Sequence, residues 1–380
     1  MRDTNILIIG AGISGAVLAE RYAHAGKKVL LLEKRSHIGG NCYDYYDENG
    51  ILVSKYGAHL FHTDDDEVWK YVNQFSEWYP WEHEVIARVG EKTVPIPVNI
   101  TTVNTLFGEN IQSEEEMKEW LDTHREHIEI PRNGEEAVLS KVGKDIYEKM
   151  FRHYTKKQWD KYPAELDASV LNRIPVRYNY DGRYFTDKYQ ALPRGGYTGL
   201  FEKILDHPNI EVRLNTDYFD IRDDIQGYEK LFYTGPVDRF FEFKHSLVEK
   251  LEYRSIVFFK ETVDAEFYQE NSVVNYPGVE VPFTRIVEYK HFGHQQSAKT
   301  TIVKEFTVDG GEPFYPVPNP RNQEIYAKYK EETEKLTDIY FVGRLANYKY
   351  FNMDQAFKNA LDLYNSLELS SLSELETHLL

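Results

Sequence analysis

Apolar and polar positions follow a strand–turn–helix–strand pattern over the first 33 residues. Residues 6–9 form a short apolar run, as expected of a strand that is covered on both faces. Ile13, Val17, Leu18 and Tyr22 then recur at helical spacing, and a second apolar run covers residues 29–32. The pattern predicts a β–α–β unit of a parallel sheet.

A glycine motif lies in the turn between the first strand and the helix. Gly10, Gly12 and Gly15 make GxGxxG, and Glu33 closes the second strand. Such a turn lets the backbone approach a pyrophosphate at the helix N-terminus, and the carboxylate accepts hydrogen bonds from ribose. We therefore expect a dinucleotide site; the alternative is a glycine turn in a sheet without a ligand.

Two further segments favour FAD over NAD. Gly39 and Gly40 follow the second strand in RSHIGGNCYDY, which is common where FAD is bound. Near the C-terminus, a strand over 339–342 leads into Gly343-Arg344 and a helix that begins near Asn352, whose N-terminus could face a flavin. Chain ends that meet at one cofactor are typical of FAD folds, although an ordinary terminal β–α unit would share this pattern.

Sequence patterns in the middle of the chain predict two further structural blocks, one helical and one built of strands. Residues 83–98 resemble a strand pair, residues 100–162 are helical and charged, and residues 250–308 are rich in strand patterns. We predict an α/β protein in which an FAD-binding Rossmann-like domain carries a helical insertion domain and an antiparallel β-sheet domain. The predicted boundaries are 1–82, 195–248 and 318–368 for the FAD domain, 99–165 for the helical domain, and 83–98, 166–194 and 249–317 for the sheet and substrate domain.

Composition narrows the class of protein. A formal net charge of -17 argues against general nucleic-acid binding, which depends on clustered Lys and Arg. The single cysteine, Cys42, excludes an intrachain disulfide and fits a reducing compartment. No signal peptide is visible, and no apolar run approaches the roughly 20 residues of a membrane-spanning helix. We expect a soluble cytoplasmic protein with no membrane span.

Several polar residues stand out without a clear role. In RIPVRYNYDGRYF, residues 173–185, three arginines alternate with tyrosines, and they could hold phosphate or lie on a solvated strand. His59 and His62 are spaced by three, but no carboxylate or cysteine stands at a supporting distance, so we expect no metal site. Tyr154, Thr155 and Trp159 are either core or one wall of a pocket.

The sequence resembles the UDP-galactopyranose mutase family over nearly its whole length. The motifs that carry the resemblance are GAGISG, YGAHLFHT, YTKKQW, RIPVRYNYDGRYF, FYTGPVD, FTRIVEYKHF, EPFYPV and GRLANYKYFNMDQ. The resemblance implies a redox-neutral isomerase that interconverts UDP-galactopyranose and UDP-galactofuranose for polysaccharide biosynthesis. It also implies that N5 of reduced FAD attacks the anomeric carbon with UDP as leaving group. The family is commonly dimeric in bacteria, so the resemblance implies a homodimer as well.

The resemblance assigns roles to individual residues. Arg173 and Arg285 would hold the diphosphate and stabilise the departing UDP, and His62 would lie close to the flavin. The other substrate contacts would be Phe151, Tyr154, Thr155 and Trp159 at the uridine, Tyr184, Tyr315 and Tyr350 at the phosphates, and Arg254, Asn275 and His59 elsewhere. The cofactor contacts would be Gly10, Gly12, Ile13, Ser14, Gly15, Glu33, Lys34, Gly40, Asn41, Gly343, Arg344, Asn352 and Met353.

One position departs from the family pattern, and two other classes remain open. Asn352 stands where part of the family has an aspartate, although the amide can still donate and accept hydrogen bonds. A flavin amine oxidase or desaturase would share the glycine turn and Glu33 but would not need paired arginines. A non-catalytic protein like the GDP-dissociation inhibitors would need no flavin.

Overall fold

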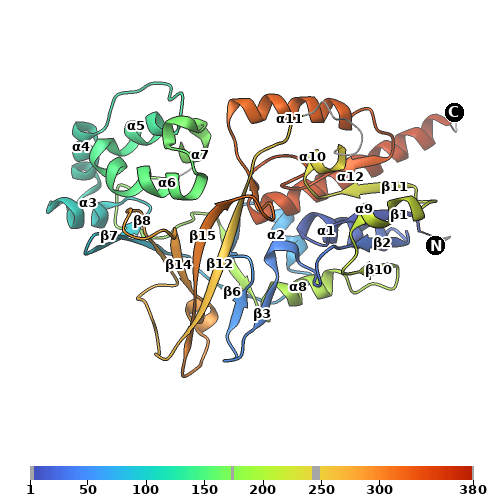
Figure 1. The fold of residues 1–380 in the computed structure, drawn as a ribbon, viewed down its shortest axis with the longest axis horizontal. Coiled ribbons are helices and arrows are strands. Elements are labelled where there is room, and N and C mark those ends of the chain that lie inside the picture. Colours follow the sequence, from blue (N-terminus) through green and yellow to red (C-terminus); the bar gives the residue numbers. More distant parts are fainter. Residues whose placement is uncertain (1–3, 173–174, 242–248, 379–380) are drawn as a thin grey trace.

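The computed structural model describes residues 4–172, 175–241 and 249–378. A parallel sheet of order β10-β2-β1-β11-β17 contains both ends of the chain (Figure 1). Its strands are β1 (Ile6–Ile9), β2 (Val29–Leu32), β10 (Ile210–Arg213), β11 (Lys230–Tyr233) and β17 (Ile339–Phe341). The sheet confirms the predicted Rossmann-like fold, and the predicted β–α–β unit forms its centre.

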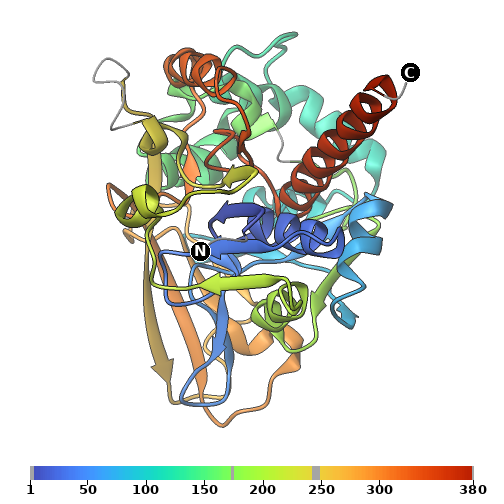
Figure 2. The same cartoon turned by 90° about the vertical axis from the view of Figure 1, so that its right-hand side faces the viewer.

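Helices cover both faces of this sheet, which explains the continuous apolar runs of its strands. Ile6 and Ile8 pack against one layer of helices, whereas Leu7 between them packs against the other. The first layer is α1 (Ile13–His24), α8 (Gly196–Ile204) and α12 (Met353–His378), and the second includes α9 (Tyr218–Ile221), α10 (Val237–Phe241) and α11 (Pro320–Thr333). The C-terminal end of α12 projects away from the sheet (Figure 2).

A larger sheet of order β16-β12-β15-β14-β13-β7-β8 forms the second block. Its strands are β7 (Val85–Val89), β8 (Lys92–Ile96), β12 (Tyr253–Val263), β13 (Val273–Asn275), β14 (Arg285–Glu288), β15 (Thr300–Asp309) and β16 (Tyr315–Pro316). The pairs are antiparallel, as predicted, except that β13 and β7 run parallel. β7 and β13 lie far apart in the sequence, so no hairpin turn requires them to run antiparallel.

The helical block lies beside the large sheet and is separate from the parallel sheet (Figure 1). It consists of α3 (Ile100–Phe107), α4 (Glu114–His124), α5 (Gly134–Ile146), a π-helical turn (Tyr147–Phe151), α6 (Arg152–Trp159) and α7 (Ala168–Asn172). Ser113 caps α4 by accepting from the backbone N–H of Glu116 at 3.2 Å. The Glu116 carboxylate reaches back to the N–H of Gln112 and not to that of Ser113, so a reciprocal capping box is not formed.

Smaller elements connect these blocks. A three-stranded sheet of order β5-β9-β6 joins distant segments, and a hairpin of β3 and β4 precedes it in the chain. Their bounds are β3 (Asp44–Tyr46), β4 (Leu52–Ser54), β5 (Phe61–Thr63), α2 (Asp66–Val72), β6 (Trp78–Pro80) and β9 (Tyr189–Pro193). The exact division into three domains stays a prediction.

Candidate active site

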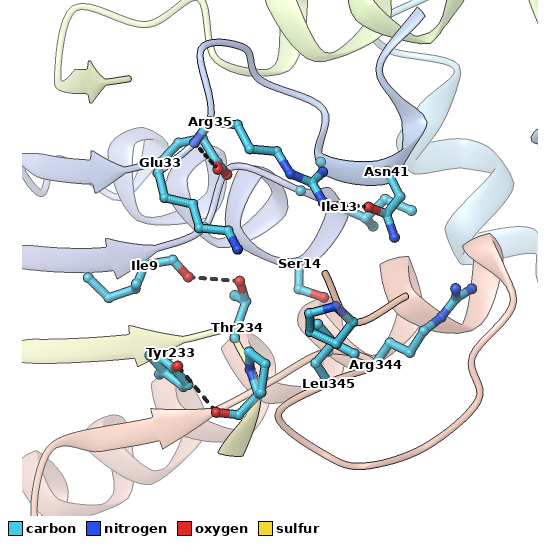
Figure 3. A pocket seen from close by; sticks show the side chains of 18 of the residues that line it. Ile9, Ile13, Ser14, Glu33, Arg35, Asn41, Tyr233, Thr234, Arg344 and Leu345 are labelled. Carbon is cyan, nitrogen blue, oxygen red and sulfur yellow. Dashed lines mark hydrogen bonds between the residues drawn. The ribbon is translucent and has the colours of Figure 1, made fainter. Parts of the chain in front are cut away.

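A cavity opens at the carboxyl ends of the parallel strands, where nucleotides bind in such sheets (Figure 3). It is lined by the glycine turn, the ends of β2 and β11, the loop after β10 and the start of α12. The predicted cofactor residues that line it are Gly10, Gly12, Ile13, Ser14, Glu33, Lys34, Gly40, Asn41, Gly343, Arg344, Asn352 and Met353. The cavity thus brings both ends of the chain to one site.

The glycine turn leaves no room for side chains. A Cβ on Gly15 would lie 1.9 Å from the carbonyl oxygen of Gly10, so α1 could not pack against the first strand. Gly40 has a φ of +55°, and its Cβ would lie 2.8 Å from the Cα of Gly12. The backbone of the turn therefore faces the cavity directly, as a pyrophosphate requires.

Glu33 binds the turn as well as facing the cavity. Its two carboxylate oxygens accept the N–H of Ala11 at 2.9 Å and the N–H of Arg35 at 2.8 Å. Each oxygen retains a further lone pair for a ribose hydroxyl. Glu33 thus orders the loop around the site, a structural role that the sequence motif alone does not reveal.

The C-terminal segment closes the cavity from the other side. The N–H of Gly343 donates to the side chains of Asn347 and Asn359, both at 3.0 Å, and Gly343 packs close to Ser14. Arg344 donates to the carbonyl oxygen of Phe351, which holds the segment before α12. This turn places the N-terminus of α12 at the cavity, where a helix dipole stabilises negative charge.

These features fit a flavin dinucleotide. An open glycine cradle, a carboxylate for ribose and a helix N-terminus all line one cavity. Sequence reasoning missed part of its wall, namely Arg35, Thr216, Asp217, Tyr218, Phe219, Tyr233, Thr234, Gly235, Pro236, Arg239 and Glu312. Their position directly after parallel strands was the available signal for several of them.

A second group of predicted residues gathers around Arg285. Its guanidinium Nε donates to Glu305 Oε2 at 2.7 Å, and Glu305 is 3% exposed. Burial is the largest single influence and acts to lower the pKa of Arg285. The charge and hydrogen bond of Glu305, together with the nearby hydroxyls of Tyr154 and Tyr289, outweigh it, so the pKa is raised. Tyr154 feels the charges of Arg285 and Glu305, and its own pKa is raised by burial. Arg285 is therefore a permanent cation near a half-buried tyrosine.

Aromatic rings form a connected wall next to this group. The rings of Trp159 and Tyr315 meet edge to face at 5.0 Å, and Tyr315 meets Tyr350 at 5.7 Å. Thr155 is buried on the same helix, and the Tyr315 hydroxyl donates to the carbonyl oxygen of Gln158. Phe151 is partly buried and packs against the same apolar cluster as Trp159 and Tyr315.

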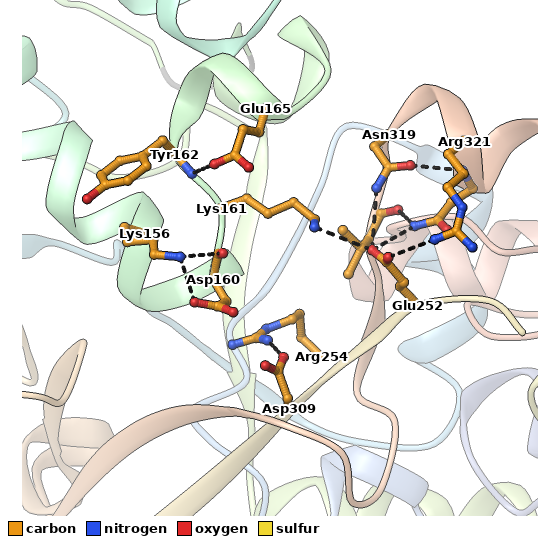
Figure 4. Close-up of polar contacts among 12 residues, drawn as sticks. Lys156, Asp160, Lys161, Tyr162, Glu165, Glu252, Arg254, Asp309, Asn319 and Arg321 are labelled. Carbon is orange, nitrogen blue, oxygen red and sulfur yellow. Dashed lines mark hydrogen bonds and ion pairs between the residues drawn. The ribbon is translucent and has the colours of Figure 1, made fainter.

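Two predicted polar residues pair with members of this group in the sheet register, Asn275 with Arg285 and Arg254 with Tyr315. Asn275 is buried beside Arg285 in the register of β13 and β14, and its Oδ1 has no hydrogen-bond partner among the described residues. Arg254 is 4% exposed and pairs with Asp309 (Figure 4). It faces a separate cavity of about 880 Å³ that Trp159 and Glu252 also line.

The two histidines have different surroundings. His59 lines the dinucleotide cavity, and its Nδ1 donates to the carbonyl oxygen of Gly57 at 2.8 Å. Burial and the charge of Arg344 lower the pKa of His59 to about 4, so it is neutral near pH 7. His62 stacks on Phe185 at 3.6 Å and faces Asp187 at 3.0 Å. It lies outside the residues that line the cavity, so its predicted flavin contact stays a prediction.

The arginine-rich segment divides into different environments. Arg173 lies outside the described residues. Arg183 pairs with Asp181 at 2.9 Å, and Arg177 donates to the carbonyl oxygen of Arg183 at 2.6 Å. These contacts fold the turn onto itself. Tyr184 follows it, donates its N–H to the carbonyl oxygen of His83 and lies near Tyr154.

Two further observations concern metal binding and membrane insertion. Within the described ranges, no group of three or more His, Cys, Asp or Glu side chains could hold a metal ion. Among the helices of the described chain, none combines the length and apolar character needed to cross a bilayer.

Comparisons with known proteins agree with this architecture. A family model described as UDP-galactopyranose mutase matches residues 149–350, and one described as an NAD(P)-binding Rossmann-like domain matches residues 8–75. A probable UDP-galactopyranose mutase of Klebsiella pneumoniae is 38% identical over 99% of this chain and 97% of its own length. A dTDP-fucopyranose mutase of Escherichia coli is also 38% identical, over 94% of this chain and 96% of its own.

A solved structure supports the fold. The crystal structure of a reduced UDP-galactopyranose mutase has a TM-score of 0.75 and covers 96% of both chains, at 19% identity. At that identity the likeness establishes the fold, whereas the family model and the sequence relatives establish the family. The chain that builds this dinucleotide cavity and arginine–tyrosine cluster belongs to the UDP-galactopyranose mutase family.

Proposed function

We propose that this protein interconverts UDP-galactopyranose and UDP-galactofuranose with FAD in its reduced form. As a member of the mutase family it is an isomerase that uses a flavin. The observation that carries the proposal is that a cluster of Arg285, Tyr154 and Glu305 lies near a dinucleotide cavity. His59 links the two, because it lines the cavity with Arg344 and feels the charges of both Arg344 and Arg285. When bound, the reduced flavin supplies a nucleophile, N5, for the anomeric carbon.

The residues of the chain would act mainly on the diphosphate. Arg285 is fixed in orientation by Glu305 through Nε, which leaves its two terminal nitrogens for phosphate oxygens. Cationic groups that stabilise the departing nucleoside diphosphate lower the barrier, because negative charge develops there in the transition state. We include Arg173 in this role, and Tyr184, Tyr315 and Tyr350 as hydroxyl donors to the phosphates.

The other side chains would orient the base and the sugar. Trp159, Thr155, Tyr154 and Phe151 would receive the uridine on α6 and the turn before it. His59, neutral near pH 7, offers an uncharged ring between the charges of Arg344 and Arg285. These contacts would hold the base and the sugar in fixed positions, so that the reacting groups meet in a defined geometry.

A second candidate substrate is dTDP-fucopyranose. The Escherichia coli mutase named for that sugar nucleotide is as similar to this chain as the Klebsiella pneumoniae relative is, at 38% identity each. Both substrates present a nucleoside diphosphate to the arginines. They differ in the base methyl group, the ribose 2′-hydroxyl and the sugar 6-hydroxyl. The leaving group is a nucleoside diphosphate in both cases, UDP or dTDP.

One experiment separates these possibilities. Protein loaded with FAD and reduced with dithionite is incubated with UDP-galactopyranose, with dTDP-fucopyranose and with UDP-N-acetylgalactosamine, and the products are separated by chromatography. We expect furanose product from UDP-galactopyranose only with reduced protein. Conversion of the dTDP-sugar alone would support the second candidate, and conversion of neither by reduced, FAD-loaded protein would refute the mutase proposal.

Two further expectations belong to the proposal. We infer a cytoplasmic location, since a sugar nucleotide substrate and a reduced flavin suit a reducing compartment. We also infer a homodimer from the family resemblance. A colourless purified protein that fails to take up FAD would favour a binding protein instead, and sustained oxidation of an amine would favour an oxidoreductase.

A further inference from the structure

The ammonium group of Lys157 joins two parts of the fold that lie far apart in the sequence. It projects from α6 and donates to the backbone carbonyl oxygens of Tyr276, Val281 at 3.3 Å and Phe283 at 3.0 Å. All three carbonyls belong to the loop between β13 and β14. An ammonium group has three N–H donors, so the three carbonyl oxygens of this loop use the full donor capacity of Lys157.

The position of this contact relates it to the candidate active site. On α6, Lys157 follows Tyr154 by one helical turn, so both side chains lie on neighbouring parts of one helix face. At the other end, Tyr276 directly follows Asn275, and Phe283 lies two residues before Arg285. Asn275 and Arg285 are paired in the register of β13 and β14. The lysine thus connects the helix expected to bind the base with the strands that carry Arg285.

We propose that Lys157 is a positioning residue that sets the separation between the base-binding wall of α6 and the diphosphate-binding Arg285. This inference rests on the proposed function, because it assumes that one nucleoside diphosphate spans both elements. A nucleotide has a fixed distance between its base and its phosphates. Loss of the contact would let α6 and the loop separate, so that base and diphosphate could no longer be bound together at full strength.

The contact depends on the charge of the lysine. Burial lowers the pKa of Lys157 to about 8, while the carboxylate of Glu280 on the same loop acts to raise it. A neutral amine has only two N–H donors and a weaker attraction for carbonyl oxygens, so it cannot satisfy all three carbonyls. The contact should therefore weaken as the pH rises through about 8.

Binding measurements on the oxidised, FAD-loaded protein test the proposal without turnover. UDP and dTDP are each titrated by calorimetry into the unmodified protein, Lys157→Met and Lys156→Met. Lys156 is the matched control, because it lies on the same helix but pairs with Asp160 at 2.8 Å. We expect Lys157→Met to lower affinity for the better ligand about tenfold or more, while Lys156→Met and the FAD content stay unchanged.

A pH series with a conservative variant separates positioning from a general loss of structure. Lys157→Arg keeps its charge well above pH 9. Between pH 7 and pH 9.5, affinity for the nucleotide should fall in the unmodified protein but stay nearly level in Lys157→Arg. This comparison remains available even if Lys157→Met folds poorly, which its unfolding midpoint would reveal.

The outcomes distinguish this inference from the proposed function. If the unmodified protein binds neither UDP nor dTDP, the proposed function itself fails. If it binds one of them and Lys157→Met, folded and FAD-loaded, binds equally well, only the role of Lys157 is overturned. A fall in affinity at high pH that is the same in Lys157→Arg would likewise overturn it.

Discussion

Arg285 and Glu305 face each other across β14 and β15, with Nε of the arginine 2.7 Å from Oε2 of the glutamate. The carboxylate is buried, whereas the arginine side chain retains 31% exposure toward the site. The other oxygen of Glu305 lies near Gly57 and has no hydrogen-bond partner among the described residues. The glutamate therefore holds the arginine by one nitrogen and leaves the rest of the guanidinium for an anion.

Glu305→Gln should weaken catalysis more than it weakens the fold. The amide keeps the shape of the side chain but loses the charge that orients Arg285, so kcat/KM should fall about tenfold to a hundredfold. Steady-state assays of the reduced enzyme provide the measurement. Glu261→Gln is the control, since that exposed residue pairs with Lys304 across β12 and β15 in the same sheet. Equal activity of the two variants would contradict the orienting role.

Arg285→Ala should abolish most turnover while FAD stays bound. Removal of a cation that stabilises a leaving group typically costs about a hundredfold to a thousandfold in rate. Arg285→Lys should recover only part of it, because lysine lacks the planar fork that binds two phosphate oxygens. The same loss is expected for Arg173→Ala. Flavin absorbance and turnover are measured on the same samples, and near-normal activity in either alanine variant would remove that residue from the proposed diphosphate site.

Gly15→Ala should yield protein without bound FAD. The added Cβ would lie 1.9 Å from the carbonyl oxygen of Gly10, which forces the turn away from the cavity. Gly199→Ala is the matched control, because that glycine is helical and a Cβ there meets no atom within 4 Å. The ratio of absorbance at 450 and 280 nm measures the flavin content. A yellow Gly15→Ala protein with the same ratio as Gly199→Ala would argue against a pyrophosphate at the turn.

His83 should make the protein sensitive to mild acid. It is 4% exposed, and burial, with the nearby charge of Arg285, lowers its pKa to about 3. The unfolded chain, with an ordinary pKa of about 6.5, binds the proton first, so stability falls as the pH drops from about 6.5 toward 3. At pH 5 this effect amounts to about 2 kcal/mol.

Urea unfolding at pH 7.5 and pH 5 tests this effect. His83→Phe keeps an aromatic ring among Tyr184, Phe185 and Phe292 but cannot bind the proton. The loss of stability between the two pH values should therefore be smaller in His83→Phe than in the unmodified protein. His127→Phe, at an exposed position, should show the unmodified pH dependence. A loss in His83→Phe as large as in the unmodified protein would exclude His83 as its source.

Much of the cofactor site was predictable because its signals are local. The glycine turn, Glu33 and the flanking strands lie within one β–α–β unit, where spacing along the chain determines spatial arrangement. Gly343 and the start of α12 were also predicted from a local strand–turn–helix pattern. The loop after β10, with Thr216 and Phe219, was missed because nothing in its own sequence marks it, and only sheet order brings it to the cavity.

The residues that support the proposed substrate site were harder to predict from sequence than the cofactor site. The family resemblance pointed to Arg285, Tyr154 and Trp159, but it did not indicate what supports them. Glu305 lies 20 residues from Arg285, and Lys157 lies 119 residues from Tyr276. Such contacts depend on strand register and on how a helix packs against a sheet, so no pattern in the sequence predicts them.

The sequence by itself determined the Rossmann-like unit, the dinucleotide cavity and the family, because apolar periodicity and tightly spaced motifs act over short distances. Only the tertiary structure decided which charges meet. It placed Glu305 behind Arg285, turned Arg254 toward a separate cavity with Asp309, and set His62 against Asp187 instead of the cavity wall. Electrostatic pairing depends on distance in space, and that distance exists only once the sheets and helices have packed.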